Sequence, residues 1–141
     1  MQYKIVQLTC GLGNQMFQYA FAKSLEYHLQ IPILLDKSWY EAEYAMHFGL
    51  DIFKIDLPYV TREQMDDVKE KINYFEKKPK IIRSILKRFG FPRSTSSSAF
   101  EYRAEYLKPN SFIYFKGFFQ NPLYFQSISS QINKILCPPP H

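Results

Sequence analysis

The chain has 141 residues, of which 46% are hydrophobic and 18% are aromatic. This composition excludes an intrinsically disordered protein, and the length suits one domain with a real hydrophobic core. The formal net charge of +5 permits an anionic partner such as a nucleotide, a phospholipid surface or a nucleic acid, but does not require one.

The first third of the chain has the pattern of a strand, a glycine loop, a helix and a second strand. Residues 3–8 are β-prone, residues 9–13 are turn-prone, and residues 14–30 are compatible with a long helix. Pro32 ends that region, and an apolar run at 33–36 closes on an aspartate, as in a buried parallel strand. The sequence therefore predicts a β-α-β unit of an α/β fold. One apolar stripe of the helix is expected to contain Phe17, Ala20, Phe21, Ser24, Leu25 and His28.

The middle of the chain predicts a long connection followed by two helices. Residues 37–58 are irregular, and a strand is expected near 53–57. Thr61 and Gln64 match a capping box at the start of an amphipathic helix that Pro79 interrupts. A second helical stretch then runs from residue 80 to residue 89 and ends at Gly90.

The last third predicts a loop, a strand and a helix. We expect a serine-rich loop at 93–98 and a strand within 111–119. Asn121 is a plausible N-cap, with a proline following it, for a final helix that reaches Leu136. The tail at 137–141 contains three prolines and is not expected to continue that helix.

Cysteine use and hydropathy limit the cellular setting. Cys10 and Cys137 are far apart and have no other metal-ligand type at useful spacing, so neither a disulfide framework nor a zinc site is supported. A reducing cytosol is the simpler expectation. Residues 1–8 lack the features of a signal peptide, and no apolar run has the length of a membrane-spanning helix.

The glycine loop is the strongest candidate for a binding site. Gly11, Gly13, Asn14 and Gln15 lie where a strand passes into a helix, so backbone N–H groups and the positive helix end can face a diphosphate. Glycines permit positive φ and close approach, and the two side-chain amides can donate hydrogen bonds. A tight turn that binds nothing is the alternative. Nicotinamide chemistry ranks lower, because Met16 stands where a dinucleotide-binding loop requires a third glycine.

The run from Cys10 to Leu25, CGLGNQMFQYAFAKSL, resembles the N-terminal signature of the bacterial alpha-1,2-fucosyltransferases, glycosyltransferase family 11. Shorter matches at 32–36, 55–59, 107–109 and 117–125 extend the resemblance over nearly the whole chain, and it is greatest to the Helicobacter-type enzymes of Lewis-antigen synthesis. Two positions depart from the pattern. The family usually has glycine in place of Cys10 and commonly tyrosine in place of Phe118.

The resemblance implies transfer of L-fucose from GDP-L-fucose to the 2-hydroxyl of a galactose-terminated glycan. Transfer is expected to invert the anomeric centre without a metal ion or cofactor. It implies a substrate-binding role for Gly11, Gly13, Asn14 and Gln15, with a plain helix cap as the alternative role of Asn14. Gln120, beside two aromatic residues, is a further candidate that could face acceptor sugar, with a loop hydrogen bond as its alternative role.

The sequence does not identify a catalytic base. His28 and His47 are expected to be structural histidines. The candidate carboxylates are Asp36, Asp51 and Asp56, and nothing local favours one of them.

The basic His-x-Arg-Arg-Gly-Asp motif that the family uses at the diphosphate does not occur in the chain. We therefore expect residues 1–141 to be the N-terminal, Rossmann-like α/β domain of a truncated GT-B-like enzyme. The donor-binding C-terminal domain is then absent, and the domain alone is expected to be inactive. A non-catalytic carbohydrate- or nucleotide-binding module is the alternative, and nucleic-acid binding is the weakest reading because no recognition module is present.

A basic amphipathic segment follows the capped helix. It could rest on an anionic membrane, which would suit a bacterial cytoplasmic enzyme peripheral on the inner membrane that modifies a lipid-linked acceptor such as lipopolysaccharide. A solvated helix face is the alternative. The segment alternates Lys77, Lys78, Lys80, Arg83, Lys87 and Arg88 with Ile81, Ile82, Ile85 and Leu86.

Overall fold

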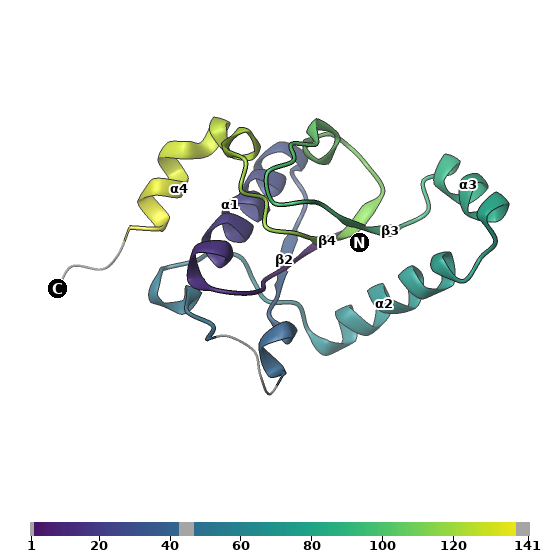
Figure 1. The fold of residues 1–141 in the computed structure, drawn as a ribbon, viewed down its shortest axis with the longest axis horizontal. Helices are drawn as coiled ribbons and strands as arrows, with labels where there is room; N and C mark the ends of the chain where they lie inside the picture. The colour runs from purple at the N-terminus through teal and green to yellow at the C-terminus, as the bar shows by residue number, and fades with distance from the viewer. Residues whose placement is uncertain (1, 43–46, 138–141) are drawn as a thin grey trace.

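A computed structural model describes residues 2–42 and 47–137. Four parallel strands form one sheet in the order β2-β1-β4-β3, with α1 covering one face and α2 the other (Figure 1). The predicted α/β class, a parallel sheet flanked by helices, is confirmed. The strands are β1 (Lys4–Gln7), β2 (Ile33–Asp36), β3 (Arg93–Ser96) and β4 (Phe112–Lys116).

Strands β1 and β4 lie side by side at the centre of the sheet. After β1 the chain moves to β2 on one side, and later it returns to build β3 and β4 on the other side. In the central register Ile5 pairs with Tyr114 and Val6 pairs with Phe115. The loops that follow β1 and β4 therefore leave neighbouring strand ends, and both lead to elements that pack on the α1 side of the sheet.

Strand alternation divides the core into two layers. Successive side chains of a strand point to opposite faces, so Ile5 packs toward α2 while Val6 packs toward α1. The α2 layer contains Ile5, Leu34, Met65, Val68 and Tyr114, and the larger α1 layer includes Val6, Leu8, Tyr19, Phe21, Leu25, Leu35 and Phe115.

Helix α1 (Leu12–Leu29) is central rather than half exposed. Ala20, Phe21, Ser24 and Leu25 of the predicted stripe are buried, but burial extends beyond one stripe to every residue from Gln18 to Leu25. The sheet covers one side of α1, and α4 (Ser129–Ile135) covers another through Ile132, which packs on Ala20. His28, expected on the stripe, is exposed.

Helices α2 (Arg62–Glu76) and α3 (Lys80–Arg88) match the predictions closely. The capping box is present: Gln64 N donates to Thr61 Oγ1 at 3.1 Å, and Thr61 N donates to Gln64 Oε1 at 2.9 Å. Gly90 follows α3 with a φ of +76°, the left-handed conformation that favours glycine after a helix.

The strand predicted at 53–57 is wrong. Two short 3-10 helices, Ser38–Glu41 and Leu50–Ile52, lie within the connection, and residues 53–57 have no regular structure. The chain reaches the free edge of β2 only at Tyr59, through a single bridge to Leu35. Pro58 has no N–H to donate, which prevents a longer ladder at this edge.

The serine-rich segment is a strand, so the loop predicted at 93–98 is also wrong. Strand β3 pairs with β4 along its length, because β4 offers a free edge that local sequence does not reveal. The hydroxyls of Thr95 and Tyr106 lie 2.7 Å apart in the interior and stabilise this polar strand.

The final helix begins later than predicted. Asn121 does act as a cap, since its Oδ1 accepts from Leu123 N at 3.0 Å, but it caps a 3-10 turn at Pro122–Tyr124. A second 3-10 turn precedes α4. The expectation for the proline tail concerns residues 138–141, which lie outside the described part of the chain.

Candidate functional site

Four of the five predicted binding residues, Gly11, Gly13, Asn14 and Gln120, lie at the carboxyl edge of the sheet, near the ends of β1 and β4. In open α/β sheets ligands bind outside the carboxyl ends of the strands. Here the loops at 8–11 and 117–121 follow β1 and β4 at that edge, and both lead to elements on the α1 side of the sheet.

A glutamine that the sequence analysis missed joins the two loops. Gln18 has no exposed surface, and its Oε1 accepts from Thr9 N at 2.9 Å. Its Nε2 donates to Thr9 Oγ1 at 2.9 Å and to the carbonyl of Gly117 at 2.8 Å. The available signal was a polar residue four positions after Asn14, one helical turn deeper in an otherwise apolar segment.

Asn14 and Gln120, 106 residues apart in sequence, are in direct contact at this edge. Gln120 Nε2 donates to Asn14 Oδ1 at 2.7 Å, and both side chains are half-buried. One amide–amide hydrogen bond leaves one NH₂ group and one carbonyl oxygen of the pair available, whichever way the two amides are turned. Within residues 2–42 and 47–137 neither group has another side-chain partner. The pair can therefore donate to an anionic oxygen and accept from a hydroxyl.

The start of α1 lies beside this pair and is open. Gly11 is the N-cap and supplies no side-chain hydrogen bond, and no acidic residue lies in the first turn. The first backbone N–H groups of a helix have no intrahelical partner, so they can bind an anion. Gly13 is exposed in this turn, and a Cβ added there would meet nothing within 4 Å.

Gln15 lies in the interior, away from the pair of Asn14 and Gln120. It has no exposed surface. Its Oε1 accepts from the N–H groups of Gly49 and Leu50, and its Nε2 donates to the carbonyls of Cys10 and His47. All four hydrogen-bonding positions of the amide are used within the protein. The structure thus gives the Gln15 side chain a structural role, that of fixing the loop.

Positive φ occurs in both loops, but not at the residues expected. Gly11 has a φ of −77°, whereas Cys10 has a φ of 64° and Phe119 a φ of 52°. The expectation that Gly11 and Gly13 supply positive φ is therefore wrong. The carbonyl of Cys10 is held by Gln15 Nε2 at 2.9 Å and Tyr40 Oη at 2.7 Å, which fixes the strained conformation.

An aromatic cluster packs against the loop at 117–121. Phe119 is buried and stacks on Phe21, with ring centroids 3.9 Å apart and planes 3° apart. Tyr124 meets Phe21 edge-on at 5.0 Å, and its hydroxyl donates to the carbonyl of Glu101. At Gly117 an added Cβ would lie 2.8 Å from the carbonyl of Ser97, so this position requires glycine.

The three candidate carboxylates are occupied by neighbouring groups. Asp36 is buried and accepts from the Tyr114 hydroxyl and from Ser38 N. Asp56 accepts from Tyr19 Oη at 2.5 Å and Lys23 Nζ at 3.0 Å. Burial opposes ionisation of Asp56, but these two hydrogen bonds outweigh it and lower the pKa of Asp56 below its ordinary value. Asp51, the third, accepts from Tyr59 Oη at 3.1 Å near the surface.

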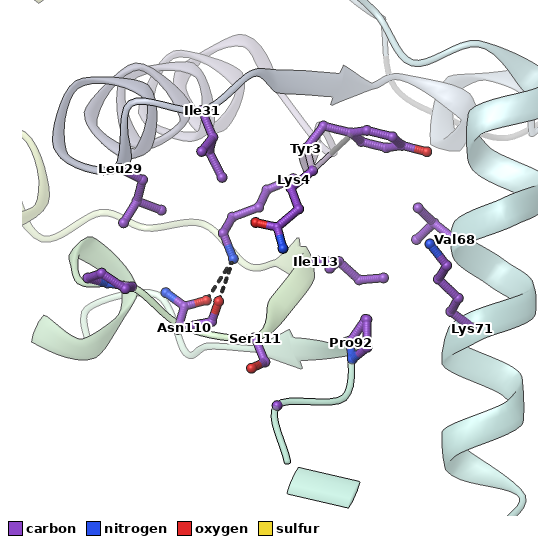
Figure 2. A pocket seen from close by; sticks show the side chains of 13 residues that line it. Tyr3, Lys4, Leu29, Ile31, Val68, Lys71, Pro92, Asn110, Ser111 and Ile113 are labelled. Carbon is purple, nitrogen blue, oxygen red and sulfur yellow. Dashed lines mark hydrogen bonds between the residues drawn. The ribbon is translucent and has the colours of Figure 1, made fainter. Parts of the chain in front are cut away.

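Two hollows lie at opposite edges of the sheet. One of about 410 Å³ is at the carboxyl edge on the α2 side, and its lining includes Asp36, Lys69 and Lys116. The other, of about 260 Å³, is at the amino edge, where Lys4 lines its wall (Figure 2). We favour the carboxyl edge as the functional one, because ligands of α/β proteins bind outside the carboxyl ends of the strands and the Asn14 and Gln120 amides meet there.

Lys4 at the amino edge is a structural residue. Its side chain is 6% exposed, and Nζ donates to the Asn110 carbonyl and Asn110 Oδ1 (Figure 2), and also to the carbonyl of Phe112. Among the described residues no carboxylate pairs with it. Burial and the nearby positive charge of Arg93 lower the pKa of Lys4 to about 8.

Metal-binding and membrane-spanning features were sought in the same described ranges. No group of three His, Cys, Asp or Glu side chains that could hold a metal ion occurs there. No helix there is long and apolar enough to cross a bilayer. Cys10 and Cys137 are both free thiols.

The chain is similar in sequence to a known glycosyltransferase. The chain is similar to an alpha-1,2-colitosyltransferase of Escherichia coli, with 33% identity over 147 aligned residues. The alignment covers 98% of this chain and 46% of the relative, so the chain spans less than half of the relative's length. No family model matches the chain, and no solved structure matches it.

The left-handed conformation of Cys10 predicts the effect of restoring glycine. Cys10→Gly should raise the free energy of unfolding by roughly 0.5–1 kcal/mol. Glycine adopts positive φ without the Cβ penalty, and this gain exceeds the entropic cost of its greater freedom in the unfolded chain. Urea denaturation measures the difference. Cys10→Ala is the matched control, since it removes the thiol but keeps the Cβ. An equal gain in both variants would show that backbone strain is not the cause.

The lowered pKa of Lys4 predicts a pH dependence of stability. Between about pH 8 and 9.5 the unfolded lysine holds its proton while the folded one loses it, so the unfolding free energy should rise with pH. Above about pH 10 tyrosine ionisation intervenes. Urea titrations of the wild type and of Lys4→Met isolate the effect, and the rise should be missing in Lys4→Met. A parallel rise in both proteins would contradict the assignment.

Proposed function

We propose that the chain is the first α/β domain of a glycosyltransferase that transfers L-fucose from GDP-L-fucose to the 2-hydroxyl of a galactose-terminated glycan. The observation that carries the proposal is the contact of Asn14 with Gln120 beside the open start of α1. Both residues were candidates from sequence, and they meet at the carboxyl edge of the sheet, outside which α/β proteins bind ligands.

The geometry suits a sugar diphosphate. The unpaired N–H groups at the start of α1 and the positive helix end can stabilise the charge that develops on the departing diphosphate. The available NH₂ group of the amide pair can donate to a phosphate oxygen, and the available carbonyl can accept from a sugar hydroxyl. The proposed reaction uses no metal ion or cofactor and inverts the anomeric centre, as the resemblance to the fucosyltransferases implies.

The relative supports the linkage and the class of sugar. Its name specifies alpha-1,2 transfer of colitose, and colitose is L-fucose without the 3-hydroxyl group. A site that hydrogen-bonds this hydroxyl would discriminate strongly against the sugar that lacks it. We propose fucose as the donor sugar because the run from Cys10 to Leu25 resembles the fucosyltransferase signature.

We assign the remaining groups that bind the diphosphate to a part of the enzyme outside residues 1–141. The chain matches less than half of its relative, and it lacks the basic motif expected at the diphosphate. We propose that residues 1–141 form the N-terminal domain of a GT-B-like enzyme that works in the bacterial cytoplasm. On this proposal the isolated domain binds GDP-fucose weakly and shows little turnover.

Binding to the 141-residue chain tests the proposal directly. We expect GDP-L-fucose to shift the amide NMR signals of Asn14 and Gln120, and the effect should be smaller with GDP-colitose. Asn14→Ala should lower the affinity roughly tenfold to a hundredfold, the effect of losing a hydrogen bond to a charged group. Asn133→Ala, an exposed asparagine of α4, is the matched control and should bind as the wild type does.

A second variant separates ligand contact from structural damage. Gly13→Ala has no internal clash, so the free energy of unfolding should not fall. Donor affinity should fall, because a diphosphate lying against the backbone would meet the new methyl group. Unchanged GDP-fucose affinity in both Gly13→Ala and Asn14→Ala would refute a donor site here. Binding without transfer in any longer form of the enzyme would favour the non-catalytic alternative.

A further inference from the structure

Helix α3 exposes an apolar face that the rest of the described chain does not cover. Ile81 is 75% exposed, and Phe89, directly after the helix, is 82% exposed. Ile82 and Ile85 between them are also exposed. At 100° per residue these four side chains fall within one 100° sector of the helix. Large apolar side chains clustered in this way usually mark an interaction surface.

The other two sectors of α3 have different roles. Leu86 and Arg83 are the partly covered residues, so this sector faces the protein. The third sector is basic and exposed, with Lys80, Lys87 and Arg88. The helix thus attaches to the protein along one side and presents an apolar sector and a basic sector to the surroundings.

The charge around this helix is of one sign. Lys77 and Lys78 lie directly before it, and residues 77–100 contain no acidic residue. Within the range 80–88 no side chain takes part in an ion pair. An apolar sector bordered by uncompensated positive charge is complementary to a bilayer with anionic headgroups, in which the apolar side chains enter the acyl boundary and the lysines contact phosphates.

We propose that α3, with Phe89, docks the protein onto the surface of an anionic lipid bilayer. The occupant is a membrane surface, and the proposal is independent of the fucosyl transfer proposed above. The helix lies in the membrane plane and does not span it. Binding through nine helical residues is weak and reversible.

The fold leaves the candidate site free when α3 is docked. Residues 89–92 connect α3 directly to the amino end of β3, so the helix adjoins the amino edge of the sheet. The contact of Asn14 with Gln120 is at the carboxyl edge. Figure 1 shows α3 at the opposite end of the molecule from α4. A docked protein would therefore leave its candidate site uncovered by the membrane contact.

Vesicle co-sedimentation tests the docking surface. We expect the protein to bind vesicles of phosphatidylglycerol and phosphatidylcholine, and to bind pure phosphatidylcholine vesicles at least tenfold less. Each basic residue near an anionic surface contributes roughly a fivefold factor in partitioning. Lys80→Glu/Lys87→Glu should therefore weaken vesicle binding more than tenfold, and Ile81→Ser/Ile85→Ser should weaken it by a comparable factor. The four substituted side chains are exposed, so the thermal unfolding temperature of both variants should equal that of the wild type.

A charge-matched control removes the effect of net charge. Lys54→Glu/Lys134→Glu alters net charge by the same amount at exposed positions outside α3 and should keep vesicle binding. Equal binding to anionic and neutral vesicles would overturn the proposal, as would equal losses in the control and in Lys80→Glu/Lys87→Glu. A dimer in sedimentation equilibrium that Ile81→Ser/Ile85→Ser dissociates would also overturn it, because the apolar face would then belong to a second copy.

Discussion

The buried amide of Gln18 is the interaction on which the candidate site depends. It hydrogen-bonds Thr9 in the loop after β1 and Gly117 in the loop after β4, and so fixes the distance between the two loops. Asn14 lies in the first turn of α1, just after the first loop, and Gln120 lies in the second loop. A buried amide without partners is costly, so the two loops are stable together in this arrangement and neither is independent of the other. The contact of Asn14 with Gln120 follows from this constraint.

Backbone strain is concentrated in the same two loops. Cys10 and Phe119 adopt left-handed conformations that non-glycine residues rarely occupy. Such conformations persist only where the surroundings fix them. Gln15 and Tyr40 hold the Cys10 carbonyl, and the stack on Phe21 holds Phe119. Binding and catalytic sites commonly store strain of this kind, because a ligand is bound with less loss of entropy by groups that are already fixed.

The two edges of the sheet have different chemistry. At the carboxyl edge lie unpaired amide groups and the backbone N–H groups at the start of α1, which suit a polar ligand. At the amino edge Lys4 uses its protons on neutral oxygens of the protein, and the neighbouring α3 turns an apolar and basic surface outward.

Local sequence determined the elements whose signals lie within a few residues. The strand, glycine loop and helix at the start, the capping box of Thr61 and Gln64, and the stop at Gly90 are all short-range effects, and the structure confirms them. Tertiary structure alone decided that the serine-rich segment pairs as β3, that Cys10 rather than Gly11 takes positive φ, and that Gln15 lies inside while Asn14 meets Gln120. These outcomes depend on partners between about 20 and 106 residues away, such as Phe112, Gly49 and Gln120. Propensity and spacing describe only near neighbours, so the free edge of a strand or the partner of a buried amide appears only when the chain is folded.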